Sequence, residues 1–251
     1  MGSVKFRHAL SRNLKNKGTR KSATATESWI FMGYFIAIDG LDGSGKGTQS
    51  EKLVEYLKGI GKKVRVLSFP MYENESSAFV KMYLDGKLGD KPSDTNAYTA
   101  SMFFACDRYI SYKTDWIKDI LDPETIVVAN RYTTANAVHQ LSKLPEAEWE
   151  GFLSWLWDFE FGKLGLPAPD KVVYLELPPR LSLSLVKSRS DTTGQKMDIH
   201  EKDTEYMAKC YEAALYSCRA LGWEQIKCYE GDTIRTREDI FDEILTRLNL
   251  K

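Results

Sequence analysis

The stretch that decides the fold is Asp39-Gly-Leu-Asp-Gly-Ser-Gly-Lys-Gly-Thr-Gln49. Its four glycines lack a Cβ, so the backbone can curl and direct its N–H groups inward. An apolar, strand-like run precedes the stretch at residues 34–38, and an amphipathic helical pattern follows it. Strand, glycine-rich turn, lysine and helix in this order are typical of a loop that holds nucleotide phosphates.

We expect this turn to bind ATP. Lys46 can reach the β- and γ-phosphate oxygens, and the helix that follows points the positive end of its dipole at the same anion. The predicted nucleotide contacts form one continuous segment: Gly40, Leu41, Asp42, Gly43, Ser44, Gly45, Lys46, Gly47 and Thr48. Gly47 stands where the common pattern has a Ser or Thr hydroxyl for Mg²⁺. Asp42 is therefore the candidate to orient the water shell of the metal.

Strand-like and helical patterns alternate from Met32 onward. The predicted strands are short and largely apolar, and cover residues 34–39, 64–69, 125–130, 171–177 and 225–229. The predicted helices cover residues 48–58, 76–84, 95–121, 133–141, 147–161, 180–188, 202–220 and 237–248. This order predicts an α/β, three-layer P-loop NTPase fold with a five-stranded parallel sheet and helices on both faces. Residues 188–198 are polar, and we expect a short lid loop there.

Charge is unevenly distributed along the chain. The net charge is zero, but residues 1–31 hold seven basic residues against one acidic residue, so residues 32–251 carry −6. A mildly acidic body argues against nucleic-acid binding, and no apolar run is long enough to cross a bilayer. We therefore expect one domain over 32–251 with neither a nucleic-acid nor a membrane partner.

The basic leader, residues 1–31, has no sustained apolar period, and we expect it to be disordered. It is read as an upstream extension, with an organelle transit peptide as the alternative. A third possibility is a nucleic-acid or membrane arm. The expected location is cytoplasmic, or organellar if the leader is a transit peptide.

Cysteine usage gives little support for a metal centre. The four cysteines include no C-x-x-C pair, and the chain has only three histidines. A zinc site is therefore unexpected, and free thiols in a reducing compartment are the natural interpretation.

Five short motifs follow the phosphate loop in a fixed order. They read Phe69-Pro-Met-Tyr72, Phe103-Phe-Ala-Cys-Asp-Arg-Tyr109, Asn130-Arg-Tyr-Thr-Thr-Ala-Asn-Ala-Val-His-Gln140, Pro169-Asp-Lys-Val-Val-Tyr-Leu-Glu-Leu-Pro-Pro179 and Asp198-Ile-His-Glu201. Together they resemble the thymidylate kinase family over about 220 residues from Met32 on. Each motif is short, but their combination is specific.

The resemblance implies roles for several side chains in binding a nucleoside monophosphate. Phe104 would stack on the thymine ring, and Arg108, one helical turn later, would bind the monophosphate. Arg131 matches the family arginine near the acceptor phosphate. Asn136 and Gln140 match positions that hydrogen-bond the base.

Two further regions carry implied site residues. Phe69 and Tyr72 belong to a motif near the acceptor phosphate. In the polar loop, Arg189 could approach the transferring phosphoryl group or be a solvated charge. Asp198 and Glu201 match a lid motif, and their spacing also fits a helix N-cap with its capping-box acid.

Plainer interpretations stay open for some of these residues. Phe104 could simply be core, since the neighbouring Phe103 is apolar too. Arg108 could form a surface pair with Asp107 or Asp115. Asn136 and Gln140 could be ordinary amides on the surface of a helix. Tyr72 could be an aromatic residue packed in a loop.

Three positions depart from the family pattern. Asn130 stands where the family usually has Asp, which keeps hydrogen bonding but loses the charge. His139 stands where many members carry Tyr, so selectivity for deoxyribose is open. Ala135 replaces a usual Ser.

The expected activity is transfer of the γ-phosphate of ATP to thymidine monophosphate, with Mg²⁺ and, by resemblance, in a homodimer. The residues expected to act in catalysis are Lys46, Arg131, Asp42 and Arg189. The alternatives are a kinase for another nucleoside monophosphate, a deoxynucleoside kinase, or a nucleotide-binding homologue with weakened turnover.

Overall fold

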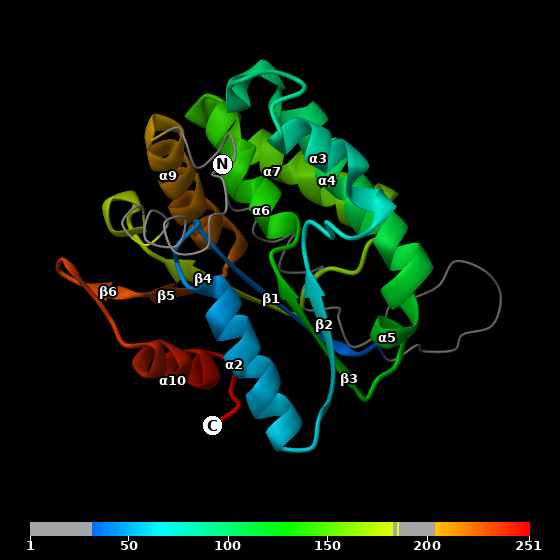
Figure 1. Cartoon of the computed structure of the whole chain (residues 1–251), viewed down its shortest axis with the longest axis vertical. Coiled ribbons are helices and arrows are strands. Elements are labelled where there is room, and N and C mark those ends of the chain that lie inside the picture. The colour runs from blue at the N-terminus through cyan, green and yellow to red at the C-terminus, as the bar shows by residue number, and fades with distance from the viewer. Residues whose placement is uncertain (1–31, 183–184, 186–203) are drawn as a thin grey trace, which may run out of the picture.

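The computed structural model describes residues 32–182, 185 and 204–251. Five strands form one parallel sheet in the order β2–β3–β1–β4–β5 (Figure 1). Their bounds are β1 (Tyr34–Gly40), β2 (Lys63–Ser68), β3 (Thr125–Asn130), β4 (Lys171–Glu176) and β5 (Glu224–Lys227). The predicted five-stranded parallel sheet is confirmed. Because β1 and β3 are parallel neighbours, their carboxyl ends bring Asp39 and Arg131 to the same edge of the sheet.

Helices connect the strands and cover both faces of the sheet. The α-helices are α2 (Lys46–Gly59), α3 (Ala78–Leu84), α4 (Ala97–Ser111), α5 (Ile117–Leu121), α6 (Thr133–His139), α7 (Trp149–Trp157), α9 (Thr204–Leu221) and α10 (Arg237–Arg247). Short 3₁₀ turns lie at η1 (Glu75–Ser77), η2 (Pro92–Asp94), η4 (Leu141–Lys143) and η5 (Glu146–Glu148), and π turns at η3 (Tyr112–Trp116) and η6 (Asp158–Lys163). A small hairpin pairs β6 (Tyr229–Glu230) with β7 (Thr233–Ile234).

The core is divided between the two faces of the sheet, because successive strand residues point to opposite sides. Ile36 and Ile38 of β1 belong to a cluster with buried residues of α2 and α10. Phe35 and Ala37 belong to a second cluster with α4, α6, α7 and α9. Figure 1 shows α2 and α10 side by side, away from the larger group of helices. This arrangement confirms the three layers.

The helix predicted over residues 95–121 is interrupted. Asn96 caps its start by accepting a hydrogen bond from the Thr99 N–H at 2.9 Å, and the α-helical part then runs to Ser111. The π turn η3 follows and places Trp116 fully inside the core, in edge contact with Phe35. Periodicity misses the break because a π turn keeps a helical pattern while shifting the following residues around the axis.

Two regions singled out in the sequence fall outside the described residues. They are the basic leader, residues 1–31, and most of residues 180–203, including the expected lid. Within the described ranges, no helix has both the length and the apolar character needed to cross a membrane.

Candidate active site

The glycine-rich turn lies at the carboxyl end of β1 and leads directly into α2. Gly43 and Gly45 have φ of 83° and 85°, a conformation that L side chains rarely adopt. A Cβ at Gly40 would come within 2.4 Å of Ser44 Oγ and 2.8 Å of the Leu175 carbonyl oxygen. The backbone geometry therefore requires glycine at these positions, as expected for a phosphate-binding loop.

Two cations meet on one carboxylate oxygen at this turn. Lys46 Nζ lies 2.9 Å from Asp42 Oδ1, and Arg131 Nη2 lies 2.6 Å from the same atom. Burial raises the pKa of Asp42, but the charges of Arg131 and Lys46 outweigh it and hold that pKa well below its usual value. Burial and the Arg131 charge lower the pKa of Lys46. The arrangement concentrates positive charge around a single anionic position.

Arg131 holds its place through strained backbone and a fixed set of partners. Its φ is 64°, and its N–H donates to the Ile38 carbonyl oxygen at 2.9 Å. A left-handed non-glycine residue costs on the order of 1–3 kcal/mol and is often found at functional sites. Arg131 Nη1 also lies 3.7 Å from Asp39 Oδ1 and 3.1 Å from His139 Nε2.

Asp39 anchors this side of the site from within the core. It is 1% exposed and accepts hydrogen bonds from the Gly40 N–H at 2.8 Å and from Thr134 Oγ1 at 2.5 Å. Both carboxylate oxygens are thereby fixed. Asp39 thus joins the phosphate loop to the start of α6, a role that the sequence pattern did not reveal.

Arg108 lies in a different network. Its Nε and Nη2 bind the two carboxylate oxygens of Glu160 at 2.7 and 2.5 Å, and the two side chains are 2% and 0% exposed. Glu160 also accepts hydrogen bonds from Thr133 Oγ1 at 2.7 Å and Asn136 Nδ2 at 3.1 Å. The expectation that Arg108 grips the acceptor phosphate is therefore not supported, because its guanidinium fork is committed to Glu160.

The surface pairs considered for Arg108 are wrong, because its partner is the buried Glu160. Asp107 is buried and instead accepts from the Met71 N–H at 2.9 Å and Ser76 Oγ at 2.6 Å. Asp115 pairs with Arg65. Asp107 thus fastens the loop after β2 to α4. The true partner, Glu160, stands between two aromatic residues, and an acid in such an apolar run is the signal that could have indicated a buried ion pair.

The residues expected to contact the base lie on α4 and α6. Asn136 is buried and donates to the Ser101 carbonyl oxygen at 3.2 Å. Gln140, one turn further, is 1% exposed, and neither its Oε1 nor its Nε2 has a hydrogen-bond partner. Ser101 Oγ is buried without a partner as well. Burial rules out the helix-surface interpretation of both amides.

Phe103 and Phe104 are both half-buried and pack against the same small cluster of Tyr83 and Ala100. Phe103 stacks against Phe79, whereas the half-buried Phe104 makes an edge contact with Tyr83 at 6.1 Å. The expectation that Phe69 contacts substrate is corrected here. Its ring is 5% exposed and packs against Tyr132 at 5.6 Å, so Phe69 belongs to the core.

Tyr72 remains a site candidate. Tyr72 is 49% exposed. Burial lowers the pKa of Arg131, but the charges of Asp42 and Asp39, with a smaller contribution from Tyr72, outweigh it and raise that pKa. At the end of β3, Asn130 Oδ1 is buried without a hydrogen-bond partner. Arg189, Asp198 and Glu201 lie outside the described residues, and their roles stay predictions.

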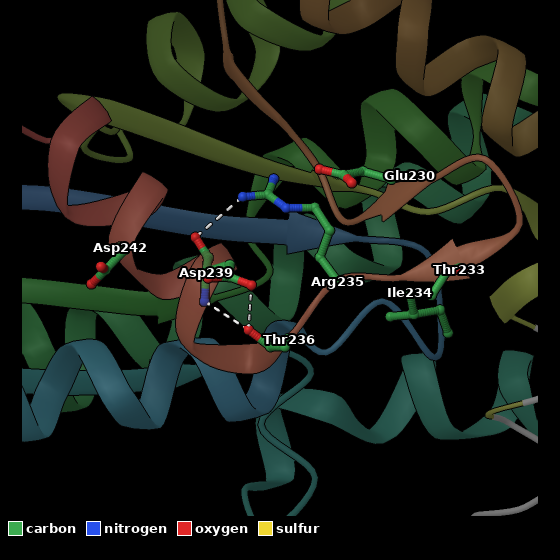
Figure 2. Close-up of a pocket in the computed structure, with 7 residues that line it drawn as sticks. All are labelled: Glu230, Thr233, Ile234, Arg235, Thr236, Asp239 and Asp242. Atoms are coloured by element: carbon green, nitrogen blue, oxygen red, sulfur yellow. Dashed lines mark hydrogen bonds between the residues drawn. The ribbon is translucent and has the colours of Figure 1, made fainter.

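A cavity of about 570 Å³ lies between the β6–β7 hairpin and helix α10 (Figure 2). Its lining comes from the β6–β7 hairpin and the start of α10: Glu230, Thr233, Ile234, Arg235, Thr236, Asp239 and Asp242. Gln49 of α2 donates to the Arg237 carbonyl oxygen at 2.9 Å, which fastens α10 one turn beyond Lys46. Sequence reasoning did not single out this cavity, although its lining comes from one continuous stretch of the chain, residues 230–242.

Comparison with known proteins shows the family to which this chain belongs. A model of the thymidylate kinase family matches residues 38–222. Thymidylate kinase of Mycobacterium tuberculosis (strain H37Rv) is 32% identical over 191 residues, covering 75% of this chain and 86% of that protein. Thymidylate kinase of Plasmodium falciparum is 32% identical over 213 residues, covering 85% of this chain and 88% of that protein.

A solved structure of thymidylate kinase from Candida albicans has the same fold. Its TM-score is 0.61 at 18% sequence identity, and the match covers 87% of this chain and 92% of that one. The family model spans well over half of this chain, including the phosphate loop after Asp39 and the motif around Arg131. The chain therefore belongs to the thymidylate kinase family.

Proposed function

We propose that the protein transfers the γ-phosphate of ATP to thymidine monophosphate, giving the diphosphate and ADP. The observation that carries this proposal is the convergence of Lys46 and Arg131 on Asp42 Oδ1 at 2.9 and 2.6 Å. One cation comes from the phosphate loop and the other from the end of β3. Two phosphates that approach from these two elements would meet between them.

Phosphoryl transfer needs in-line positioning and positive charge over the transferring group. Lys46 and the loop N–H groups would hold the ATP phosphates. Arg131 would bind the acceptor phosphate and offset its repulsion with ATP. No general base is required, because the attacking phosphate oxygen is already ionised at neutral pH.

The base of the acceptor would bind between α4 and α6. The two unpartnered polar atoms of Gln140 and the Oγ of Ser101 are buried, and buried polar groups normally have partners. A pyrimidine edge with both carbonyl and N–H groups would satisfy them. Phe104 lies three residues after Ser101 on α4 and would supply an aromatic face, worth roughly 1–3 kcal/mol when a base stacks on it.

The residues present fit Mg²⁺ as a cofactor. Across the residues described, no three His, Cys, Asp or Glu side chains gather into a metal cluster. Mg²⁺ needs no such cage, since it usually binds one or two carboxylates together with waters and substrate phosphates. Asp42, with the Thr48 hydroxyl, would hold it. When bound, the ion would offset negative charge on the ATP phosphates.

A coupled ADP-release assay tests the substrate assignment. The purified protein is given ATP and Mg²⁺ with dTMP, dUMP, UMP, CMP or AMP as acceptor. We expect dTMP to give the highest kcat/KM. A different preferred acceptor, or ATP binding without acceptor-dependent ADP release, would overturn the assignment in favour of another monophosphate kinase or a homologue without turnover.

We also propose a homodimer formed through α3 and α4. These helices expose large apolar side chains at helical spacing: Phe79, Met82, Tyr98, Met102, Tyr109 and Ile110. Contiguous exposed apolar patches usually mark interaction surfaces. Light scattering should give a dimer for the wild type and a monomer for Met102→Glu. Ile60→Glu, at an equally exposed position in the α2–β2 turn, is the matched control and should remain dimeric.

We propose residues 32–251 as the kinase domain, acting in the cytoplasm, with residues 1–31 dispensable for catalysis. Deleting residues 1–31 should leave kcat and both KM values unchanged. Loss of activity would assign the leader a part in catalysis. A change of cellular location with unchanged activity would instead favour an organelle transit peptide.

A further inference from the structure

His139, the last residue of α6, lies between Arg131 and helix α9. Its Nε2 is 3.1 Å from Arg131 Nη1, and its Nδ1 is 3.6 Å from Cys210 Sγ. The residue is 4% exposed, and its carbonyl oxygen accepts a hydrogen bond from the Tyr206 hydroxyl at 2.7 Å. The ring is thus held from both sides by groups of different elements.

The chemistry of the partners fixes the proton on this ring. A guanidinium only donates hydrogen bonds, so Nε2 facing Arg131 must be the acceptor. The proton of the neutral imidazole is then on Nδ1, where it points at Cys210 Sγ. Cys210 in turn donates to Ser142 Oγ at 3.3 Å, and Ser142 Oγ donates to the His139 carbonyl oxygen at 2.9 Å. All donors and acceptors in this circuit are consistent with one tautomer.

The electrostatic surroundings agree with a neutral ring. Burial and the charge of Arg131 lower the pKa of His139 to about 3. Burial raises the pKa of the Cys210 thiol to about 12, so its S–H keeps the proton that it donates to Ser142. Neither group adds a charge that would compete with a phosphate for Arg131.

We propose that His139 is a positioning residue, which directs the Arg131 guanidinium toward the acceptor phosphate through a neutral hydrogen bond at Nη1. The inference rests on the proposed function, because it assigns the phosphate to Arg131. A neutral acceptor fixes the direction of the guanidinium and leaves its positive charge for the ligand. A carboxylate in the same place would fix the direction and also cancel that charge.

Two substitutions separate this role from simple packing. His139→Phe keeps a planar ring but removes the acceptor, and His139→Gln offers an amide oxygen at the position of Nε2. We expect His139→Phe to lower kcat/KM for dTMP about 10- to 100-fold, since misplacing a binding group costs this much. The Kd for ATP should change less than about 2-fold, because Lys46 and the loop hold that nucleotide.

His139→Gln should recover kcat/KM to within about 5-fold of the wild type, as geometry is restored without the ring. Equal loss in both variants with equal thermal stability would overturn the proposal. The comparison is made on wild-type activity with dTMP, so an inactive wild type signals failure of the proposed function and not of this inference.

A spectroscopic measurement tests the tautomer without any substrate and without a variant that must fold. The chain has only three histidines, so nitrogen-15 NMR of the imidazoles in the wild type can resolve His139. We expect a neutral ring that is protonated at Nδ1 at neutral pH, because Arg131 faces Nε2. A charged ring, or a proton on Nε2, would contradict the proposal.

Discussion

Two arginines, one buried and one partly exposed, each bind a carboxylate but behave differently in this structure. Arg108 and Glu160 are 2% and 0% exposed, and hydrogen bonds reach both oxygens of the acid. Arg131 and Asp42 are 15% and 16% exposed, and Lys46 binds the same Asp42 oxygen as Arg131 does. Arg131 also depends on a left-handed backbone conformation. The first pair is closed to solvent, whereas the second is open and strained.

The difference indicates which arginine can exchange its partner for a ligand. Removing Arg108 from Glu160 would leave a charge buried in the core. Arg131 can give up Asp42 at lower cost, because Lys46 still neutralises the carboxylate and solvent reaches it. We infer that Arg131 meets substrate phosphate and that Arg108 holds α4, α6 and the η6 turn together.

The largest expected effect is on stability, at the closed pair. Arg108→Leu should lower the free energy of unfolding by about 3–5 kcal/mol, because Glu160 is left buried and unpaired. The double variant Arg108→Leu/Glu160→Leu should recover more than half of that loss in urea unfolding. If the single variant is as stable as the wild type, the pair is not closed in solution and the comparison fails.

The next effect is on catalysis, at the open cluster. Lys46→Ala should reduce kcat about 10²- to 10³-fold, as loss of one charge-stabilising donor does in other enzymes. Thermal unfolding should be nearly unchanged, since Asp42 keeps Arg131. Lys52→Ala is the control: Lys52 lies on the same helix, pairs with the exposed Glu238 and lies over the Phe241 ring, and its loss should leave activity intact. Retained turnover in Lys46→Ala would remove the loop from the mechanism.

The smallest effect, counted per pH unit, is the pH dependence of stability from His139. Its folded-state pKa is lowered from 6.5 to about 3, so between these values the unfolded chain binds a proton that the folded chain does not. Stability therefore falls as pH decreases through this window, by at most about 1.4 kcal/mol per pH unit. Nearby Arg131, Lys46, Lys143 and Asp42 also act on this ring.

His139→Gln does not titrate, and its chemical unfolding measured from pH 7 to 4 should show a correspondingly smaller loss. If the free energy of unfolding depends on pH with the same slope in both proteins, His139 becomes charged in the folded state over this pH range. Arg131 would then face an N–H group instead of a lone pair, unlike Arg108 with its carboxylate.

The sequence predicted the features that depend on neighbouring residues. The phosphate loop, the five strands and the order of layers follow from glycines, periodicity and alternation within short windows. The carboxylate partners of Arg108 and Arg131 could not be predicted from such local patterns. Glu160 is 52 residues from Arg108, and Asp42 is 89 from Arg131, so their pairing depends on how distant elements pack.

Other misses have the same cause. The resemblance of its motif predicts that Phe69 contacts substrate, yet its ring packs against Tyr132 and Trp116. The break before Trp116 leaves the helical pattern of residues 95–121 intact. Each of these depends on a long-range contact that no local pattern encodes.

The most direct test of the account compares the affinity of dTMP with that of thymidine, which lacks the phosphate, for the wild type and Arg131→Ala. Calorimetry in the presence of a non-hydrolysable ATP analogue gives all four Kd values. The account predicts that the wild type prefers dTMP and that Arg131→Ala loses about 10- to 100-fold of this preference, as expected for hydrogen bonds to a charged group. An undiminished preference in Arg131→Ala would contradict it.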